Sequence, residues 1–328
     1  MDAAVHVVDE CLGAESGYAL AAFFVDAADA ANGGGRVVSV GPAPELAWLA
    51  DRGAVSVVPD YQAVLCVLER VRWPGVRWGG EATAVHCWSP TALRHAAALA
   101  RRNRCSLTLH LPSACAAAKL DLPRQARKLA RETVPFRVTV PASPSADRLV
   151  AQGLPADVVV VCPPVVLPIP ADLPAERRRA RRALGLADDM RLIVAPDAMI
   201  REAGLKFAVW AHAILRHIRP NVRLCMPTDG PGREALLHFA AAAGFRDELL
   251  LPRADVDVPA ALAAADVVAF FREDDIGLAA PATARAMNRP ILAAATPDTR
   301  HILGPHATIV PPNDPRQMAS ALLKVLHL

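Results

Sequence analysis

The sequence predicts an α/β protein made of two domains, each built around a parallel sheet. Short runs of β-branched and other apolar residues alternate with longer Ala- and Leu-rich stretches along the whole chain. This alternation is interrupted by the proline-rich segment 165–175 and then resumes. The length of 328 residues suits two domains, because a typical domain has about 150 residues.

In the first half, each strand-like run is followed by a stretch of helical length. The expected strands are 5–8, 36–41, 54–58, 82–88, 106–112, 137–143 and 158–164. The expected helices are 17–31, 44–53, 61–71, 89–103 and 144–153. The helix at 89–103 has the clearest start, since Ser89 can cap it and Pro90 suits its first position.

The segment VVLPIPADLPA, residues 165–175, is the expected linker, because proline continues neither a helix nor a central strand. We therefore expect domains at 1–166 and 167–328. Beyond the linker, the expected strands are 190–197, 222–227, 248–252, 266–271, 289–294 and 307–312, and the expected helices are 204–218, 232–244, 259–265, 282–288 and a terminal helix. Two such sheets place a ligand beyond the carboxyl ends of their strands.

Charge and composition exclude some classes of partner. The net charge is only +3, so no nucleic-acid partner is expected. The arginine run at 177–182 is the most basic stretch. It is either a solvated helix face or a peripheral contact with an anionic membrane surface or phosphate-rich partner.

Cysteine usage and the start of the chain bear on compartment. Seven cysteines without CxxC spacing predict neither a disulfide framework nor a zinc site, and no metal ligand set is expected. The first residues, MDAAVHVVDE, lack the basic start and apolar run of a signal peptide. No uninterrupted apolar stretch reaches the length of a membrane span. We expect a cytoplasmic protein.

Several segments then occur in a familiar order. They are CLGAESGYAL and SLTLHLPS in the first half, and GLKFAVWAHAILRHIRPNVRLCMPTDG, AALAAADVVAFFREDDIGL and PNDPRQMASALLKVL in the second. In this order they resemble the segments of retaining GT-B glycosyltransferases. The family is the one called glycosyltransferase family 4-like, or glycosyl transferases group 1. The resemblance implies two Rossmann-like domains and transfer of a sugar from a nucleotide-sugar donor with retention. It implies no metal or other cofactor.

The resemblance also implies a cationic pair that neutralises the donor diphosphate. The family has a lysine directly before a glycine on the loop after the first strand of its second domain. Here Ala203 stands before Gly204, whereas Arg201 and Lys206 lie nearby and can substitute. The alternative is that both are surface charges at a helix start.

Two glutamates of the family hold the sugar and the ribose. Counted back from Gly277, Asp274 stands at the first position, with Glu273 and Asp275 beside it. The second position falls at Thr283 or Ala282, neither of which is a carboxylate. A threonine hydroxyl offers a ribose a weaker grip than a carboxylate. A solvated acidic loop is the alternative.

In the first domain, His110 ends a predicted strand where the family has a histidine near the donor. The alternative is a histidine bonded to nearby backbone. For His86, beside Cys87 and Trp88, we favour a structural role. Gly13 and Gly17 either let backbone amides approach phosphate or simply shape a turn.

Two functions therefore stay open. The first is an active glycosyltransferase, with His110 and Asp274 as catalytic residues and Gly13, Gly17, Arg201, Lys206, Glu273, Gly277 and Thr283 on the donor. The second is a catalytically silent relative that acts as a binding or scaffold protein; a sugar-nucleotide epimerase is a further, weaker alternative. The acceptor, whether glycan, lipid or small molecule, is not encoded in any motif.

Overall fold

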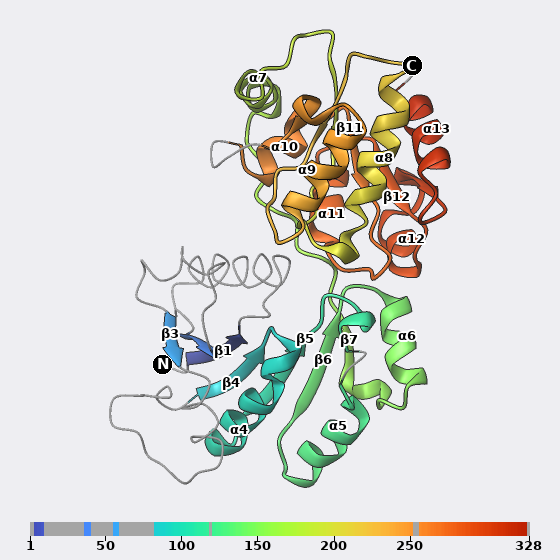
Figure 1. Ribbon diagram of the computed structural model, residues 1–328. Helices are drawn as coiled ribbons and strands as arrows, with labels where there is room; N and C mark the ends of the chain where they lie inside the picture. The colour runs from blue at the N-terminus through green and yellow to red at the C-terminus, as the bar shows by residue number, and fades with distance from the viewer. Residues whose placement is uncertain are drawn as a thin grey trace. The chain divides into compact units, whose positions relative to one another are not determined.

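The computed structural model describes residues 3–9, 36–40, 55–58, 82–117, 120–251 and 256–326. The chain divides into two compact units, Met1–Pro163 and Pro164–Leu328. Each unit contains one sheet, and every strand pairing that is described is parallel (Figure 1). The α/β class with two parallel sheets is confirmed.

Unit 1 has the strand order β3-β2-β1-β4-β5-β6-β7. The strands are β1 Ala3–Asp9, β2 Arg36–Val40, β3 Val55–Val58, β4 Ala82–Cys87, β5 Ser106–His110, β6 Phe136–Val140 and β7 Val159–Val161. Its described helices are α4 Leu93–Asn103, α5 Leu122–Arg131 and α6 Ser143–Ala151. Apolar side chains of β1, β4, β5 and β6 form one core with those of α4 and α5.

Helix α5 was not among the expected elements, although its local signals are clear. Asp121 caps it by accepting a hydrogen bond from the backbone nitrogen of Arg124 at 3.1 Å, and a proline stands in its first turn. Leu122, Ala126 and Leu129 recur at helical spacing and are buried. A cap followed by this period is therefore a signal that the sequence analysis missed.

Unit 2 has the strand order β10-β9-β8-β11-β12-β13. The strands are β8 Arg191–Val194, β9 Val222–Cys225, β10 Leu249–Leu250, β11 Val267–Phe270, β12 Ile291–Ala294 and β13 Ala307–Val310. The helices are α7 Leu173–Ala183, α8 Leu205–Arg216, α9 Arg233–Ala242, α10 Val258–Ala264, α11 Ala279–Ala286, α12 Pro297–Leu303 and α13 Pro315–Val325. Each predicted strand of this half has an observed counterpart.

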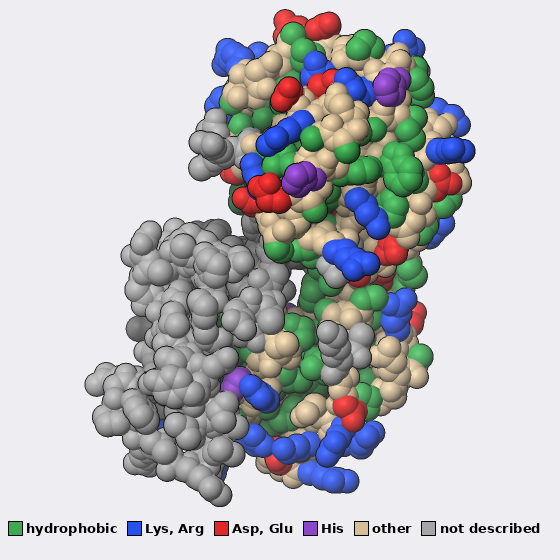
Figure 2. Space-filling model, in the orientation of Figure 1, with side chains coloured by type: hydrophobic (Ala, Val, Ile, Leu, Met, Phe, Trp, Pro, Cys, Tyr) green, Lys and Arg blue, Asp and Glu red, His purple; other side chains and the backbone are tan. Residues whose placement is uncertain are grey.

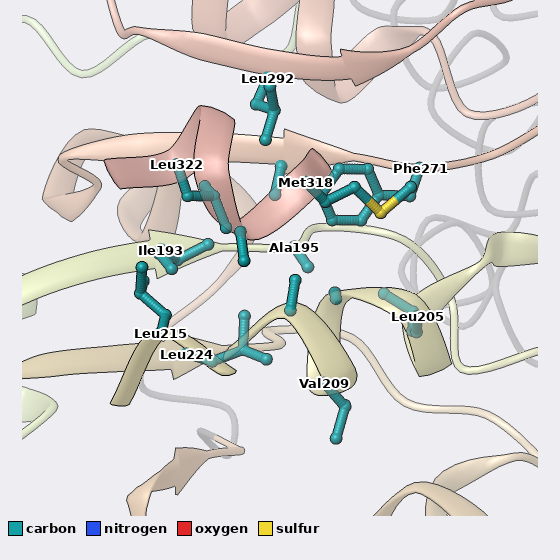
Figure 3. Close-up of a cluster of buried hydrophobic side chains, with 14 of the residues drawn as sticks. Ile193, Ala195, Leu205, Val209, Leu215, Leu224, Phe271, Leu292, Met318 and Leu322 are labelled. Atoms are coloured by element: carbon teal, nitrogen blue, oxygen red, sulfur yellow. The ribbon is translucent and has the colours of Figure 1, made fainter. Parts of the chain in front are cut away.

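The core of unit 2 lies between its sheet and the helices α8 and α13 (Figure 3). Ile193 and Leu224 face Leu215 of α8, and Leu292 lies near Leu322 of α13. All five side chains are at most 2% exposed. Burial of this kind contributes about 1.5–3 kcal/mol for each large apolar side chain, so the core holds the strand ends of this unit in place.

The arginine run at 177–182 lies on α7, and two of its side chains turn inward. Arg177 donates to Asp266 at 2.6 Å and to the carbonyl oxygens of Ala264 and Ala265, both at 2.7 Å. Arg181 also reaches Asp266, at 3.2 Å. These bonds tie α7 to the start of β11, so part of the run serves packing and not an open basic surface.

On the face shown in Figure 2, Lys and Arg side chains of unit 2 lie scattered among Asp and Glu. In the described ranges, no helix is both long and apolar enough to cross a membrane.

Candidate functional site

The order of strands in unit 2 creates a crevice between β8 and β11. From β8 the sheet grows outward through β9 and β10, and from β11 it grows the other way through β12 and β13. The connections that leave the carboxyl ends of β8 and β11 therefore turn away from each other. Open α/β sheets bind ligands at such a switch point.

Gly204 allows the β8–α8 connection to approach the β11 connection. It follows a 3-10 turn, Arg201–Ala203, and has a φ of +69°. A Cβ atom at this position would lie 2.6 Å from the backbone oxygen of Phe271, the residue after β11. Glycine is therefore required both by the backbone conformation and by the close contact.

A pocket of about 260 Å³ opens beside this contact. Its lining residues are Arg201, Gly204, Lys206, Phe207, Glu273 and Asn313. The structure thus brings together side chains from two separate sequence motifs: the Arg201 and Lys206 pair, and Glu273 of the acidic loop. Asn313 was not predicted.

One wall of the pocket is positively charged. Arg201 lies in the 3-10 turn, and Lys206 lies in the first turn of α8 with its Nζ 4.7 Å from the ring centroid of Phe207. Among the described side chains, none forms an ion pair with Arg201 or Lys206 and none caps the first turn of α8. Two cations beside a helix N-terminus suit an anion such as a phosphate.

Asp274, which the sequence placed on the sugar, is engaged by a neighbour. Its carboxylate accepts two hydrogen bonds from Arg272, from Nε at 2.8 Å and from Nη2 at 2.6 Å. Arg272 is buried, and its Nη1 lies 3.7 Å from the buried carboxylate of Asp197. Asp274 therefore helps to balance a buried cation, which is a structural role.

The next two carboxylates of the loop face different surroundings. Asp275 is buried with a φ of +57°, and it accepts hydrogen bonds from the Thr296 hydroxyl and from the Thr299 backbone nitrogen at 3.3 Å. It thereby fixes the start of α12. Glu273 is exposed and lines the pocket. Of the three adjacent acids, Glu273 is the one that lines the pocket.

Gly277 packs beneath the same loop. Its φ is +86°, and a Cβ atom there would lie 2.9 Å from Oδ1 of Asp197 and 3.3 Å from Cδ of Arg272. The glycine therefore leaves room for the buried Arg272–Asp197 pair. These two close approaches are structural, whereas the sequence placed Gly277 on the donor.

Thr283 lies inside α11 and is fully buried. Its hydroxyl donates to the carbonyl oxygen of Ala279 at 2.7 Å and accepts from the backbone nitrogen of Leu167 at 2.8 Å. These bonds tie the start of unit 2 to α11. The arrangement favours a structural role for Thr283 over the ribose contact that the sequence suggested.

In unit 1, His110 belongs to a cluster of imidazoles and indole at the carboxyl ends of the central strands. Its Nε2 lies 2.9 Å from Nδ1 of His86, and its Nδ1 lies 2.9 Å from the hydroxyl of Thr139. The ring of Trp88 stacks on it with centroids 3.8 Å apart. Both ring nitrogens of His110 are therefore hydrogen-bonded within the cluster.

His6 extends this cluster across β1. It is the register partner of His86, and its Nδ1 accepts a hydrogen bond from the indole of Trp88 at 3.0 Å. Burial, followed by the charge of His86, lowers the pKa of His6 and of His110 to about 3, and burial lowers the pKa of His86. The rings are therefore neutral at pH 7. Gly13 and Gly17 lie outside the described residues.

Comparisons with known proteins fit this arrangement. Residues 191–327 match the model of the family described as glycosyl transferases group 1. A comparison with curated proteins found no match. Among solved structures, Anabaena Alr3699/HepE in complex with UDP and glucose superposes with a TM-score of 0.76 at 16% identity, over 98% of this chain and 89% of that chain. The chain has the GT-B fold.

Two further GT-B structures are similar over almost the whole chain. A glycosyltransferase from Rickettsia africae ESF-5 has a TM-score of 0.71 at 12% identity, with 99% of this chain and 88% of that chain covered. WaaG, a glycosyltransferase involved in lipopolysaccharide biosynthesis, has a TM-score of 0.65 at 15% identity, with 99% and 90% covered. The family match spans every residue that lines the pocket of unit 2.

Proposed function

We propose that this protein transfers a sugar from a nucleotide-sugar donor to an acceptor. The observation that carries the proposal is the meeting of Arg201, Lys206, the start of α8 and Glu273 in one pocket at the switch point of the unit 2 sheet. Support also comes from the GT-B fold and from HepE, which was solved with UDP-glucose as well as with UDP.

The positive wall is suited to the leaving group. When the bond from the sugar to the diphosphate breaks, negative charge grows on the phosphate oxygens. This charge can be stabilised by groups that already lie at the pocket, namely Arg201, Lys206 and the N-terminal amides of α8. This is a route that needs no metal ion, and we propose metal-independent transfer.

The acidic side of the pocket is suited to the sugar. Glu273 presents an acceptor-only carboxylate, which binds hydroxyl groups and repels phosphates. The charges thus orient a donor with its diphosphate at Arg201 and Lys206. We further propose retention of configuration and a donor-side role for His110, with an acceptor that is a glycan, a lipid or a small molecule.

Calorimetric titration with UDP, GDP and ADP tests the proposal. The wild-type protein should bind one of them with micromolar affinity. Arg201→Ala and Lys206→Ala should each weaken that binding about tenfold or more, because each removes a charge-assisted contact. Arg182→Ala and Lys324→Ala remove exposed charges elsewhere and should change nothing. No binding of any nucleotide at millimolar concentration contradicts the proposal.

A catalytically silent binding protein is the second candidate, and particular residues favour it. Asp274 is held by Arg272, Thr283 is buried, and Ala203 stands before Gly204. Nucleotide release from the bound nucleotide sugar distinguishes the candidates. If the sugar is transferred to water or to an added acceptor, free nucleotide appears, and this result supports the transferase. If the nucleotide sugar stays bound and intact for hours, this result supports the silent protein.

A further inference from the structure

Asn313 is held in a turn that is fixed on both sides. It follows β13 after two prolines and has a φ of +60°, a conformation that asparagine tolerates better than most residues. Asp314 then caps α13 by accepting hydrogen bonds from the backbone nitrogens of Arg316 at 3.1 Å and Gln317 at 3.0 Å. The side chain of Asn313 is therefore presented from a rigid corner.

The turn that contains Asn313 contacts the loop after β11 at the carboxyl end of the sheet. The Nδ2 of Asn313 donates a hydrogen bond to Oε1 of Glu273, which lies on the loop after β11. Because β12 separates β11 from β13 in the sheet, the bond joins the loops of two non-adjacent strands. Both side chains line the pocket that also contains Arg201 and Lys206.

The partner of Glu273 decides what its carboxylate can do. An exposed glutamate side chain is flexible, and two cations line the same pocket as Glu273. The amide of Asn313 occupies one carboxylate oxygen without neutralising the charge, because an amide is a neutral donor. The remaining acceptor positions stay available to a ligand.

We propose that Asn313 and Glu273 select the sugar of the donor. Glu273 accepts hydrogen bonds from hydroxyl groups of the transferred sugar, and Asn313 is the positioning residue that holds its carboxylate for them. This inference rests on the proposed function. The pocket volume of about 260 Å³ lies below the range of roughly 300–1,000 Å³ for whole small-molecule ligands, and it suits one sugar next to its phosphate.

The test compares a nucleotide with its own glucose conjugate. The nucleotide that binds the wild-type protein is titrated alongside UDP-glucose, GDP-glucose or ADP-glucose, whichever contains it. The variants are Glu273→Gln, Asn313→Asp and Asn313→Gly. The last two tolerate the positive φ, so loss of the amide donor is separated from backbone strain.

Two matched controls accompany these variants. Glu234→Gln neutralises an exposed glutamate on α9, and Asn288→Gly replaces an exposed asparagine with a φ of +53°. Thermal unfolding of every variant checks that the fold is intact. Neither control should change the affinity for either ligand.

We expect the pocket variants to weaken the sugar nucleotide about tenfold or more, because a hydrogen bond to a charged group is lost or misplaced. Affinity for the bare nucleotide should change less than about twofold in Asn313→Gly, which alters no charge, since a contact to the sugar alone is removed. Glu273→Gln removes a carboxylate that repels phosphates, so it should weaken the sugar nucleotide without weakening the bare nucleotide. Asn313→Asp adds a negative charge to the pocket, so its effect is compared with that of Asn313→Gly.

This inference alone is overturned if a pocket variant weakens the nucleotide and its sugar conjugate equally, or if it weakens neither. Failure of the wild-type protein to bind any of the three nucleotides overturns the proposed function and this inference with it.

Discussion

The two sheets of this protein end in contrasting chemistry. Unit 1 gathers His86 and His110, near the carboxyl ends of β4 and β5, and His6 of the adjacent β1 around Trp88. At the equivalent ends of β8 and β11, unit 2 gathers guanidinium, ammonium and carboxylate groups. The same strand geometry thus supports one site of neutral rings and one of charges.

The difference shows two ways of satisfying polar groups at a strand end. The imidazoles of unit 1 lose their charge on burial and bond to one another, to Trp88 and to Thr139. In unit 2, Arg272 keeps its charge because Asp274 and Asp197 lie beside it. Unit 1 should therefore respond mainly to pH, and unit 2 to loss of a charged partner.

The largest effect is expected from Arg272→Ala in unit 2. It leaves the buried Asp197 and the partly buried Asp274 without their cation, which typically costs about 3–5 kcal/mol. Urea unfolding of the full chain, followed by circular dichroism, measures the loss. Arg182→Ala, on the exposed side of α7, is the control and should cost almost nothing. A loss no larger than that of the control would show that the pair is dispensable.

The histidine cluster of unit 1 should make stability depend on pH. Because the folded pKa of His6 and His110 is about 3 and the unfolded value is 6.5, the unfolded chain binds more protons between these values. Stability is therefore complete above pH 6.5 and falls with decreasing pH, by about 1.4 kcal/mol per pH unit for each proton taken up. Between pH 6.5 and 4.5, one proton corresponds to about 2 kcal/mol, because the unfolded imidazole is already half protonated at pH 6.5.

Urea unfolding at a series of pH values checks this dependence. A His6→Gln/His110→Gln variant should flatten it. His212→Gln in unit 2 is the comparison for the pH dependence of stability. Burial lowers the pKa of His212 to about 4. If the double variant keeps the wild-type slope, the cluster is not the source.

The smallest of the three effects is expected at Gly204. Alanine at either Gly204 or Gly185 must adopt a positive φ, of +69° or +67°. At Gly204 its Cβ atom would also lie 2.6 Å from a backbone oxygen, whereas the space around Gly185 is open. Gly204→Ala should cost about 2–3 kcal/mol and Gly185→Ala about 1 kcal/mol. Gly204→Ala should also abolish nucleotide binding. Equal losses of stability would mean that the close approach of the two loops adds nothing.

The strands of unit 2 could be predicted because their signal is local. The run DVVAFF, for example, predicts a strand at 266–271, and β11 spans Val267–Phe270. The sequence also predicted that Gly204 begins a helix, with Arg201 and Lys206 close to its start. Short apolar runs and glycine at a turn carry this information without reference to distant residues.

Asn313 could not be placed in the pocket in the same way. Its sequence context, PPNDP, indicates a turn before a helix, which the structure contains. Nothing local shows that this turn reaches the loop after β11. That contact depends on the order of β11, β12 and β13 in the sheet.

The sequence by itself determined the alternation of strands and helices, and it predicted two domains and a cationic pair near the start of the helix at 204–218. Only the tertiary structure decided the roles of Glu273, Asp274 and Asp275. These three acids are adjacent and chemically alike, so no local pattern separates them. Their partners, Asn313, Arg272 and Thr296, come from different loops. The fold therefore assigned one acid to the pocket, one to a buried arginine and one to a helix start.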